Sequence, residues 1–225
     1  MKLMSVLILS MILFISCGSS KTANREKIAV SPYSTIVSSS GIEVYYSQGK
    51  SHTADIDKYD NVNVNVKDGL LILSRKGGRK GSAKVYLSAS KLDAVILSGG
   101  SRFFSEELKN SDKISITASG GANIDINKVK SDNCNVALSG GADCTIRQTK
   151  SEKINIAASG GSNTNIRIEK AKNANVAASG GSNITVSGRV DNISVSASGS
   201  ADVNVVNLKY DNINTNMSGR GSIRK

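Results

Sequence analysis

Six basic residues recur at one position of a sequence repeat, and their spacing would let them act together on an anion. Each follows, by eleven residues, a serine that returns about every 20 residues, except for one arginine that comes one place early. If the repeats stack as coils, these side chains form a continuous basic edge with a long-range attraction for anionic polymers. The six residues are Lys109, Lys130, Lys150, Lys170, Arg189 and Lys209.

Carboxylates close to these cations support a second interpretation of the same edge. Asp132, Glu152, Asp191 and Asp211 stand two residues behind most of the basic residues. Neighbouring opposite charges on a solvated surface would neutralise one another. The sequence therefore leaves two readings open, a self-compensated edge and a polyanion-binding surface.

A second recurring position, four residues after the serine, holds an amide or a carboxylate in five of the seven repeats. Such side chains bond their own backbone at a turn or stack as an amide ladder. Alternatively, they offer a row of polar groups to a glycan or a cation. Two carboxylates separated by three coils support calcium only weakly, so we predict no metal site. The residues are Asn123, Asp143, Asn163, Asn183 and Asp202.

Groups that could perform acid–base or nucleophilic catalysis are scarce. His52 is the single histidine, and its neighbours Ser51 and Thr53 suggest a solvated loop. Glu106 and Glu107 form the one adjacent acidic pair, whereas carbohydrate-cleaving enzymes need clustered carboxylates. We therefore predict no catalytic residues, no enzymatic activity and no cofactor.

Two cysteines, Cys134 and Cys144, lie five residues before and after Ser139. Neighbouring repeats place Ile154 and Ile184 at these positions, which predicts two buried thiols that act as small hydrophobes. A disulfide in an oxidising compartment remains the alternative. Metal ligation is disfavoured because no histidine or third thiol lies nearby in the sequence.

The repeat that would position all these residues has seven periodic Ser-Gly copies from Ser98 to Gly219, at intervals of 21, 20, 20, 20, 19 and 20 residues. Apolar residues alternate with polar ones around each Ser-Gly, which is typical of short half-buried strands. A unit of about 20 residues buries a face only by stacking on its neighbours. A propeller blade usually needs about 40 residues, and a sandwich needs no fixed period. The sequence predicts an all-β chain, a single-stranded right-handed parallel β-helix (β-solenoid) with about 20 residues per coil.

The N-terminus resembles a bacterial lipoprotein signal. Lys2 precedes an apolar run from Leu3 to Ile15, and Ser16-Cys17-Gly18 follows it. We predict a signal peptide over 1–16 and lipid attachment at Cys17, with plain secretion as the alternative. A polar tether over 17–27, an N-terminal β cap with the first irregular coils over 28–90, and regular β-helix repeats over 91–225 follow. Within the cap, residues 62–66 and 70–73 flank Asp68-Gly69 and predict a hairpin or a tight corner.

Several segments together are similar to one known family. They are the opening strand Tyr33–Val37, the segment Asp68–Ile72, and Lys84–Leu87 leading to Leu92–Gly100 and the Ser-Gly coils. This combination resembles the putative auto-transporter adhesin head (GIN) domain proteins, which are exported bacterial proteins, from about Ile28 to Ile223. The resemblance implies a right-handed β-helix and an adhesin role, and it supplies no catalytic residues. The coils here more often read Ser-Gly-Gly than the family's usual Ser-Gly-Ser-Gly.

Composition and resemblance together predict a non-enzymatic cell-envelope lipoprotein that presents a β-helical surface for adhesion. The 225-residue chain carries a net charge of +11, and only 4% of its residues are aromatic. The expected partners are the membrane, through the lipid anchor at the outer membrane, an anionic glycan, lipopolysaccharide or an envelope protein, and a second copy of the chain. Nucleic acid is excluded for an exported chain without aromatic interleaving. The alternatives are an oligomerising structural component and a polysaccharide-processing β-helix enzyme.

Overall fold

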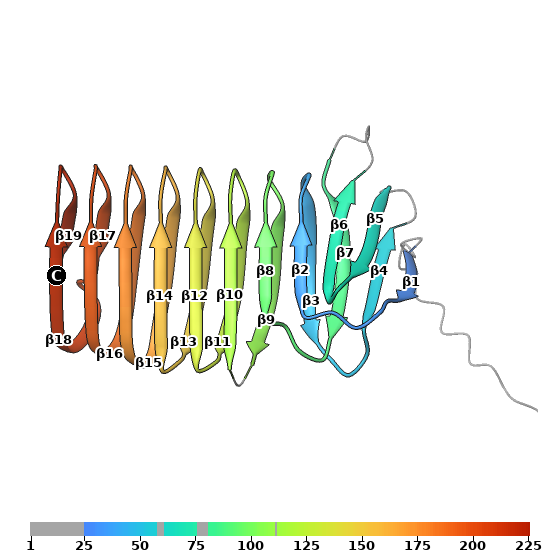
Figure 1. The fold of residues 1–225 in the computed structure, drawn as a ribbon, viewed down its shortest axis with the longest axis horizontal. Helices are drawn as coiled ribbons and strands as arrows, with labels where there is room; N and C mark the ends of the chain where they lie inside the picture. The colour runs from blue at the N-terminus through green and yellow to red at the C-terminus, as the bar shows by residue number, and fades with distance from the viewer. Residues whose placement is uncertain (1–24, 58–60, 76–80, 111) are drawn as a thin grey trace, which may run out of the picture.

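The structure is a computed structural model of the chain, and it describes residues 25–57, 61–75, 81–110 and 112–225. Strands in these ranges wind into a β-solenoid in which successive coils lie about 20 residues apart (Figure 1). The predicted all-β parallel solenoid is therefore confirmed. None of the described ranges contains a helix that could cross a membrane. The predicted signal peptide, Cys17 and most of the predicted tether lie outside these ranges.

Stacked strands form two faces of parallel sheet, which enclose the core between them. Face 1 consists of β6 (Leu70–Arg75), β2 (Thr35–Ser38), β8 (Ala94–Leu97), β10 (Lys113–Ala118), β12 (Asn133–Leu138), β14 (Lys153–Ala158), the ends of β15 (Asn163–Ala178) and β16 (Asn183–Ala197), and β18 (Leu208–Met217). Face 2 consists of β7 (Ala83–Ala89), β3 (Ile42–Gln48), β9 (Arg102–Lys109), β11 (Asn123–Lys130), β13 (Asp143–Lys150), the starts of β15 and β16, β17 (Asp202–Asn204) and β19 (Ser222–Arg224).

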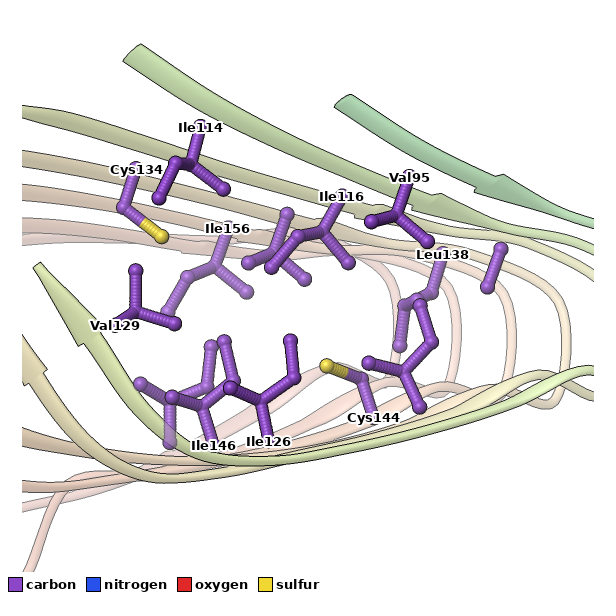
Figure 2. Packing of buried hydrophobic residues seen from close by; sticks show 14 of the residues in the cluster. Val95, Ile114, Ile116, Ile126, Val129, Cys134, Leu138, Cys144, Ile146 and Ile156 are labelled. Carbon is purple, nitrogen blue, oxygen red and sulfur yellow. The ribbon is translucent and has the colours of Figure 1, made fainter. Parts of the chain in front are cut away.

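Residues one lap apart in the sequence become neighbours in the sheet, as the repeat predicts. Ile156 pairs with Val136 on one side and with Val176 on the other. Inward side chains such as Ile116 from face 1 and Ile146 from face 2 meet in the core (Figure 2). Burying an aliphatic side chain of this size stabilises the fold by roughly 1.5–3 kcal/mol, so the stacked columns supply most of the hydrophobic stabilisation.

The Ser-Gly corners connect face 1 to face 2, and their geometry requires glycine. The first glycine of each corner has a positive φ, for example 66° at Gly140 and 69° at Gly160. The N–H of Gly161 donates to the carbonyl oxygen of Gly140 over 2.8 Å, so the corners also bond to one another. A Cβ at Gly160 would lie 2.9 Å from the Gly140 oxygen. Both the left-handed backbone and the close stacking therefore exclude larger residues.

One coil is a residue shorter than the others, and the structure places the deletion where face 2 turns toward face 1. Ile168 pairs with Gly188, 20 residues on, whereas Ala171 pairs with Val190, 19 residues on. Gly188 has φ 105°, and a Cβ there would lie 1.8 Å from the carbonyl oxygen of Ile168. The shorter coil explains why Arg189 comes one place early in the sequence.

Antiparallel strands cover the N-terminal end of the solenoid. β5 (Val62–Lys67) pairs with β6, which confirms the predicted hairpin. β4 (Thr53–Asp57) pairs with β7, and β1 (Arg25–Ala29) pairs with β4. β1 contains the last three residues of the predicted tether. The antiparallel strands occupy the sheet edges that β6 and β7 would otherwise expose.

The first coil of the chain does not lie at the end of the stack. β2 pairs with both β6 and β8, and β3 pairs with both β7 and β9. The coil formed by β2 and β3 is therefore inserted between two coils that come later in the sequence (Figure 1). From β8 onward the coils follow one another in sequence order.

Candidate ligand-binding surfaces

The basic residues align at the end of the face 2 strands, where the chain turns toward face 1. Lys130 pairs with Lys109 on one side and Lys150 on the other, and Lys150 pairs with Lys170. Arg189 pairs with Lys209 beyond the shortened coil. The parallel register aligns Lys109, Lys130, Lys150 and Lys170 with neighbours roughly 4.8 Å apart along the stack, and Arg189 and Lys209 continue this row past the register shift between Ile168 and Ala171. We call this row the lysine edge.

An open groove of about 620 Å³ follows the lysine edge. Five lysines line it, against two carboxylates, Asp132 and Glu152. The buried side chains of Asn110, Ser131 and Ser151 also line it, and the hydroxyls of Ser131 and Ser151 lie 3.5 Å apart. The groove therefore combines a basic rim with buried polar side chains.

Carboxylates neutralise the lysine edge only in part. Lys130 lies 3.2 Å from Glu107, and Arg189 lies 3.1 Å from Asp211. Glu152 pairs instead with Lys172, at 2.9 Å, and this hydrogen bond raises the pKa of Lys172. Among the described residues, no carboxylate forms an ion pair with the remaining cations of the edge, Lys109, Lys150, Lys170 and Lys209.

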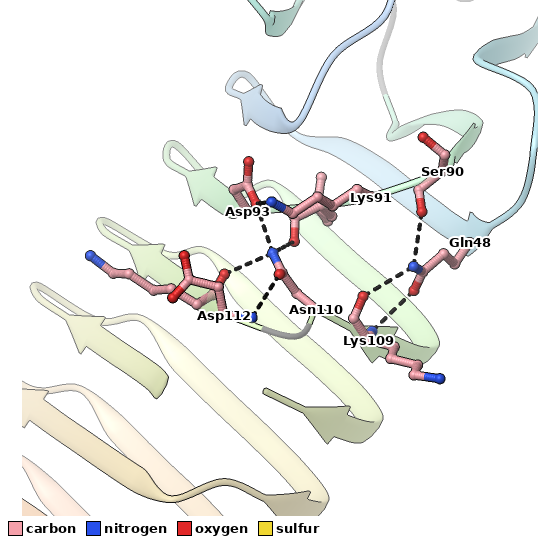
Figure 3. Close-up of polar contacts among 9 residues, drawn as sticks. Gln48, Ser90, Lys91, Asp93, Lys109, Asn110 and Asp112 are labelled. Carbon is pink, nitrogen blue, oxygen red and sulfur yellow. Dashed lines mark hydrogen bonds and ion pairs between the residues drawn. The ribbon is translucent and has the colours of Figure 1, made fainter. Parts of the chain in front are cut away.

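Polar contacts fix the N-terminal end of the lysine edge (Figure 3). The Gln48 side chain accepts a hydrogen bond from the Lys109 N–H and donates one to the Lys109 carbonyl, both over 3.0 Å. The buried Asn110 amide donates to the Asp93 carboxylate over 2.7 Å and to the Lys113 carbonyl over 2.9 Å. Burial raises the pKa of Asp93, but hydrogen bonds from Lys91, Ser34 and Asn110 outweigh burial and lower it. These contacts hold the backbone at Lys109 in place.

The corner residues form a hydrogen-bonded ladder. The Asn183 amide donates to Asn163 over 3.0 Å, and the Asn163 amide donates to the Asp143 carboxylate over 2.9 Å. Asn123 and Asp202 occupy the neighbouring positions of the same row. The central residues Asp143, Asn163 and Asn183 therefore bond to one another from coil to coil.

An aromatic groove on face 2 is a second candidate surface, and its residues are not among those predicted from the sequence. The rings of Tyr86, Tyr45 and Phe104 stack with centroids 4.9 and 5.0 Å apart and with interplanar angles of 16° and 17°. A groove of about 540 Å³ lies against this stack, and Glu106, Asp125, Asn127 and Arg147 are among its polar lining residues. Tyr45 pairs with Tyr86 and with Phe104 only because the first coil is inserted between later ones.

Donor and acceptor side chains in the aromatic groove bond to one another in pairs. The Arg147 guanidinium donates to both carboxylate oxygens of Asp125, and this contact lowers the pKa of Asp125. The Asn127 amide donates to Glu106 over 3.2 Å. At the far end of the stack, the Arg25 guanidinium lies 4.2 Å from the centroid of the Tyr86 ring. The groove thus offers aromatic surface beside both hydrogen-bond donors and acceptors.

Comparison with protein families decides where the chain belongs. The model of the family described as "Putative auto-transporter adhesin, head GIN domain" matches residues 32–167 and 138–224. The chain belongs to this family. Membership in the GIN-domain family indicates an exported protein of the adhesin type. This family is not a known enzyme family.

Solved structures share the fold of this GIN-domain chain. A putative adhesin from Bacteroides fragilis has a TM-score of 0.76 at 19% identity, covering 91% of this chain and 97% of its own. A putative adhesin from Parabacteroides merdae has a TM-score of 0.70 at 19% identity, with coverage of 89% and 94%. A putative lipid binding protein from Parabacteroides distasonis has a TM-score of 0.69 at 18% identity, with coverage of 89% and 95%. No curated protein matches the sequence.

The groups considered for catalysis are dispersed over this GIN-domain chain. His52 lies in the loop before β4, as expected, and it is only partly exposed because its ring meets Tyr33 edge-on at 5.6 Å. Glu106 lines the aromatic groove, whereas the adjacent Glu107 points to Lys130. Within the described ranges, no three His, Cys, Asp or Glu side chains gather closely enough to hold a metal ion.

The two cysteines are buried and unbonded, as the hydrophobic interpretation predicts (Figure 2). Burial raises the pKa of Cys134 to about 12, and it also raises the pKa of Cys144. Thiolate is the reactive form of cysteine, so both side chains are inert in the folded chain. They belong to the core and not to a functional site.

Proposed function

We propose that this chain is a lipid-anchored envelope adhesin that holds anionic glycan chains along its lysine edge. The anchor rests on the sequence pattern that ends at Cys17. The part of the chain that the structure describes begins at Arg25, in the strand pairing that covers the N-terminal end of the solenoid. An anchor at Cys17 would therefore leave the coils from β8 onward directed away from the attachment point.

The observation that carries the proposal is the alignment of lysines from four successive coils in one groove. Lys109, Lys150 and Lys170 have no carboxylate partner among the described residues, so their charge is available to a ligand. A linear polyanion can contact several coils at once, because each coil repeats the same cation along the stack. Long-range attraction would speed the encounter, and salt would weaken it.

Charge reversal on the lysine edge tests the proposal. The variant Lys130→Glu/Lys150→Glu/Lys170→Glu is compared with Lys67→Glu/Arg220→Glu/Arg224→Glu, which changes the net charge equally at exposed basic residues that do not line the groove. Retention of the mature chain on immobilised dextran sulfate is measured, with uncharged dextran as the blank. Losing three charge contacts should weaken binding about a hundredfold or more, whereas the control should lose roughly tenfold or less.

Equal losses in the two variants would mean that net charge alone governs retention, and would contradict the proposal. Unchanged retention in the lysine-edge variant would also contradict it and would favour the structural, oligomerising role. Thermal unfolding of each variant shows whether the solenoid remains folded.

A further inference from the structure

We infer that the aromatic groove on face 2 is a second binding site, and that it takes an uncharged saccharide. This site goes beyond the proposed polyanion surface, because none of its lining residues belongs to the lysine edge.

The column of side chains that contains the aromatic stack changes from aromatic to polar between Phe104 and the next coil. Tyr86, Tyr45 and Phe104 are followed, one coil further on, by Asp125, which pairs with Phe104 in the sheet. Phe104 therefore has a ring on one side and a short carboxylate on the other. Arg25 covers the opposite end of the stack, at Tyr86, and donates to the Tyr86 hydroxyl over 3.2 Å. The Phe104 end is consequently where a ligand would find aromatic surface.

The polar groups beside Phe104 match the hydrogen-bonding needs of a sugar. A saccharide hydroxyl both donates and accepts, and the groove offers carboxylate acceptors at Asp125 and Glu106 and donors at Asn127 and Arg147. The Arg147 side chain is 51% exposed and the Asp125 side chain 33% exposed, so both can exchange bonds with a ligand. Planar guanidinium and carboxylate groups favour bidentate contacts, which suit the adjacent hydroxyls of a sugar ring.

Charge in this groove argues against an anionic ligand. Arg147 and Asp125 neutralise one another in an ion pair, and Glu106, which accepts a hydrogen bond from Asn127, leaves the lining with one net negative charge. The groove holds about 540 Å³, within the range of small-ligand sites. Apolar C–H surfaces of a sugar pack against aromatic side chains, and such sites typically combine aromatic lining with a few placed polar groups.

A matched pair of arginine variants tests the site. Arg147 and Arg167 occupy the same position in successive coils, and both are exposed, but only Arg147 lines the groove. The mature chain is applied to an array of uncharged oligosaccharides of hexose, N-acetylhexosamine and deoxyhexose units. The strongest binder is then titrated by calorimetry against Arg147→Ala, Arg167→Ala and Phe104→Leu.

We expect Arg147→Ala and Phe104→Leu each to weaken binding about tenfold or more, and Arg167→Ala to leave it unchanged. Binding should persist at about 0.5 M salt, where screened interactions with a polyanion are lost. The chain has six tyrosines and no tryptophan, so tyrosine fluorescence provides an independent signal from Tyr45 and Tyr86.

Three results would overturn the inference. They are the absence of any uncharged binder on the array, equal effects of the two arginine variants, and loss of the same binding in the charge-reversal variant of the lysine edge. The last result would move the saccharide to the lysine edge and leave the polyanion proposal standing. Loss of polyanion binding alone would leave the aromatic groove untouched.

Discussion

One outward-facing column of face 2 crosses both regions of the solenoid, and its composition differs between them. In the N-terminal coils the column consists of the rings of Tyr86, Tyr45 and Phe104. In the repeat coils it continues as Asp125, Thr145 and Asn165. The backbone register is the same in both regions. Side chains alone therefore decide whether a stretch of this column is an apolar platform or a polar row.

The buried side chains of the N-terminal coils and of the repeat coils also differ in size. Large buried side chains such as Phe103 and Tyr46 fill the N-terminal coils, whereas Ala158, Ala178 and Ala197 occupy part of the repeat core. Small residues allow closely similar coils to stack, and the glycine corners of the repeat lie in direct contact. The N-terminal region is thus individually shaped, while the repeat region obtains its stability from nearly equivalent neighbours.

Replacing a turn glycine with alanine should give the largest difference in unfolding free energy between the two regions. Gly41 and Gly160 have nearly the same φ, 70° and 69°, but a Cβ meets nothing within 4 Å at Gly41 and lies 2.9 Å from a carbonyl oxygen at Gly160. Gly41→Ala should cost about 1 kcal/mol for the left-handed backbone, and Gly160→Ala about 3 kcal/mol because overpacking is added. Urea unfolding of both variants measures the difference. Equal losses would show that the stacked corners can move apart freely.

Alkaline pH should destabilise the repeat region before the N-terminal region. Burial raises the pKa of Cys134 from 9.0 to about 12 and that of Tyr46 from 10.0 to about 12. The folded state keeps both groups protonated while the unfolded state releases the protons, so stability is fully present below the unfolded pKa and falls as pH rises. Each group should contribute a slope of roughly 1.4 kcal/mol per pH unit, from about pH 9 for the thiol and about pH 10 for the phenol.

Unfolding free energies measured across this pH range test the order. Replacing both Cys134 and Cys144 with alanine should remove the part of the slope that begins near the thiol pKa of 9.0 and leave the tyrosine part. A slope that survives this replacement unchanged would contradict the assignment to the thiols.

Removing a hydrogen-bonded amide from face 1 should give the smallest change in stability. Asn155 accepts a hydrogen bond from Asn175 over 2.9 Å and donates one to Asn135 over 2.6 Å. Asn155→Ala should cost about 1 kcal/mol, because half-buried amide bonds are worth little net of water. Asn165, an exposed asparagine of face 2 for which the structure shows no side-chain hydrogen bond, provides the control. Thermal unfolding should show a shift for Asn155→Ala alone, and equal shifts would remove any stabilising role for the amide column.

Periodicity made the repeat region predictable from sequence. Because the same position returns every coil, aligning the Ser-Gly copies was enough to place the lysine edge, the corner ladder and the pairing of Ile156 with its neighbours. The aromatic stack could not be found in this way. Tyr45, Tyr86 and Phe104 stand at unequal distances in the sequence, and they meet only through the inserted coil. Long-range pairing without a repeat leaves no local signal to read.

The ion pairs of the lysine edge were also hard to foresee. Sequence proximity suggested Asp132 and Glu152 as partners for the adjacent lysines, but the contacts run between coils, from Glu107 to Lys130 and from Glu152 to Lys172. Which carboxylate reaches which lysine depends on the strand register and on side-chain direction. Neither can be obtained from spacing alone.

Insertion of the β2–β3 coil between later coils has a consequence for how the chain folds. From β8 onward each coil can add to the one before it, so folding there can propagate through local contacts. At the N-terminal end, β2 can complete its pairing only after both β6 and β8 have formed. Its pairing with β8 closes a loop from Thr35 to Ala94. Such non-local closure has an entropic cost and slows folding. We expect the N-terminal end to be the last part of the solenoid to become ordered.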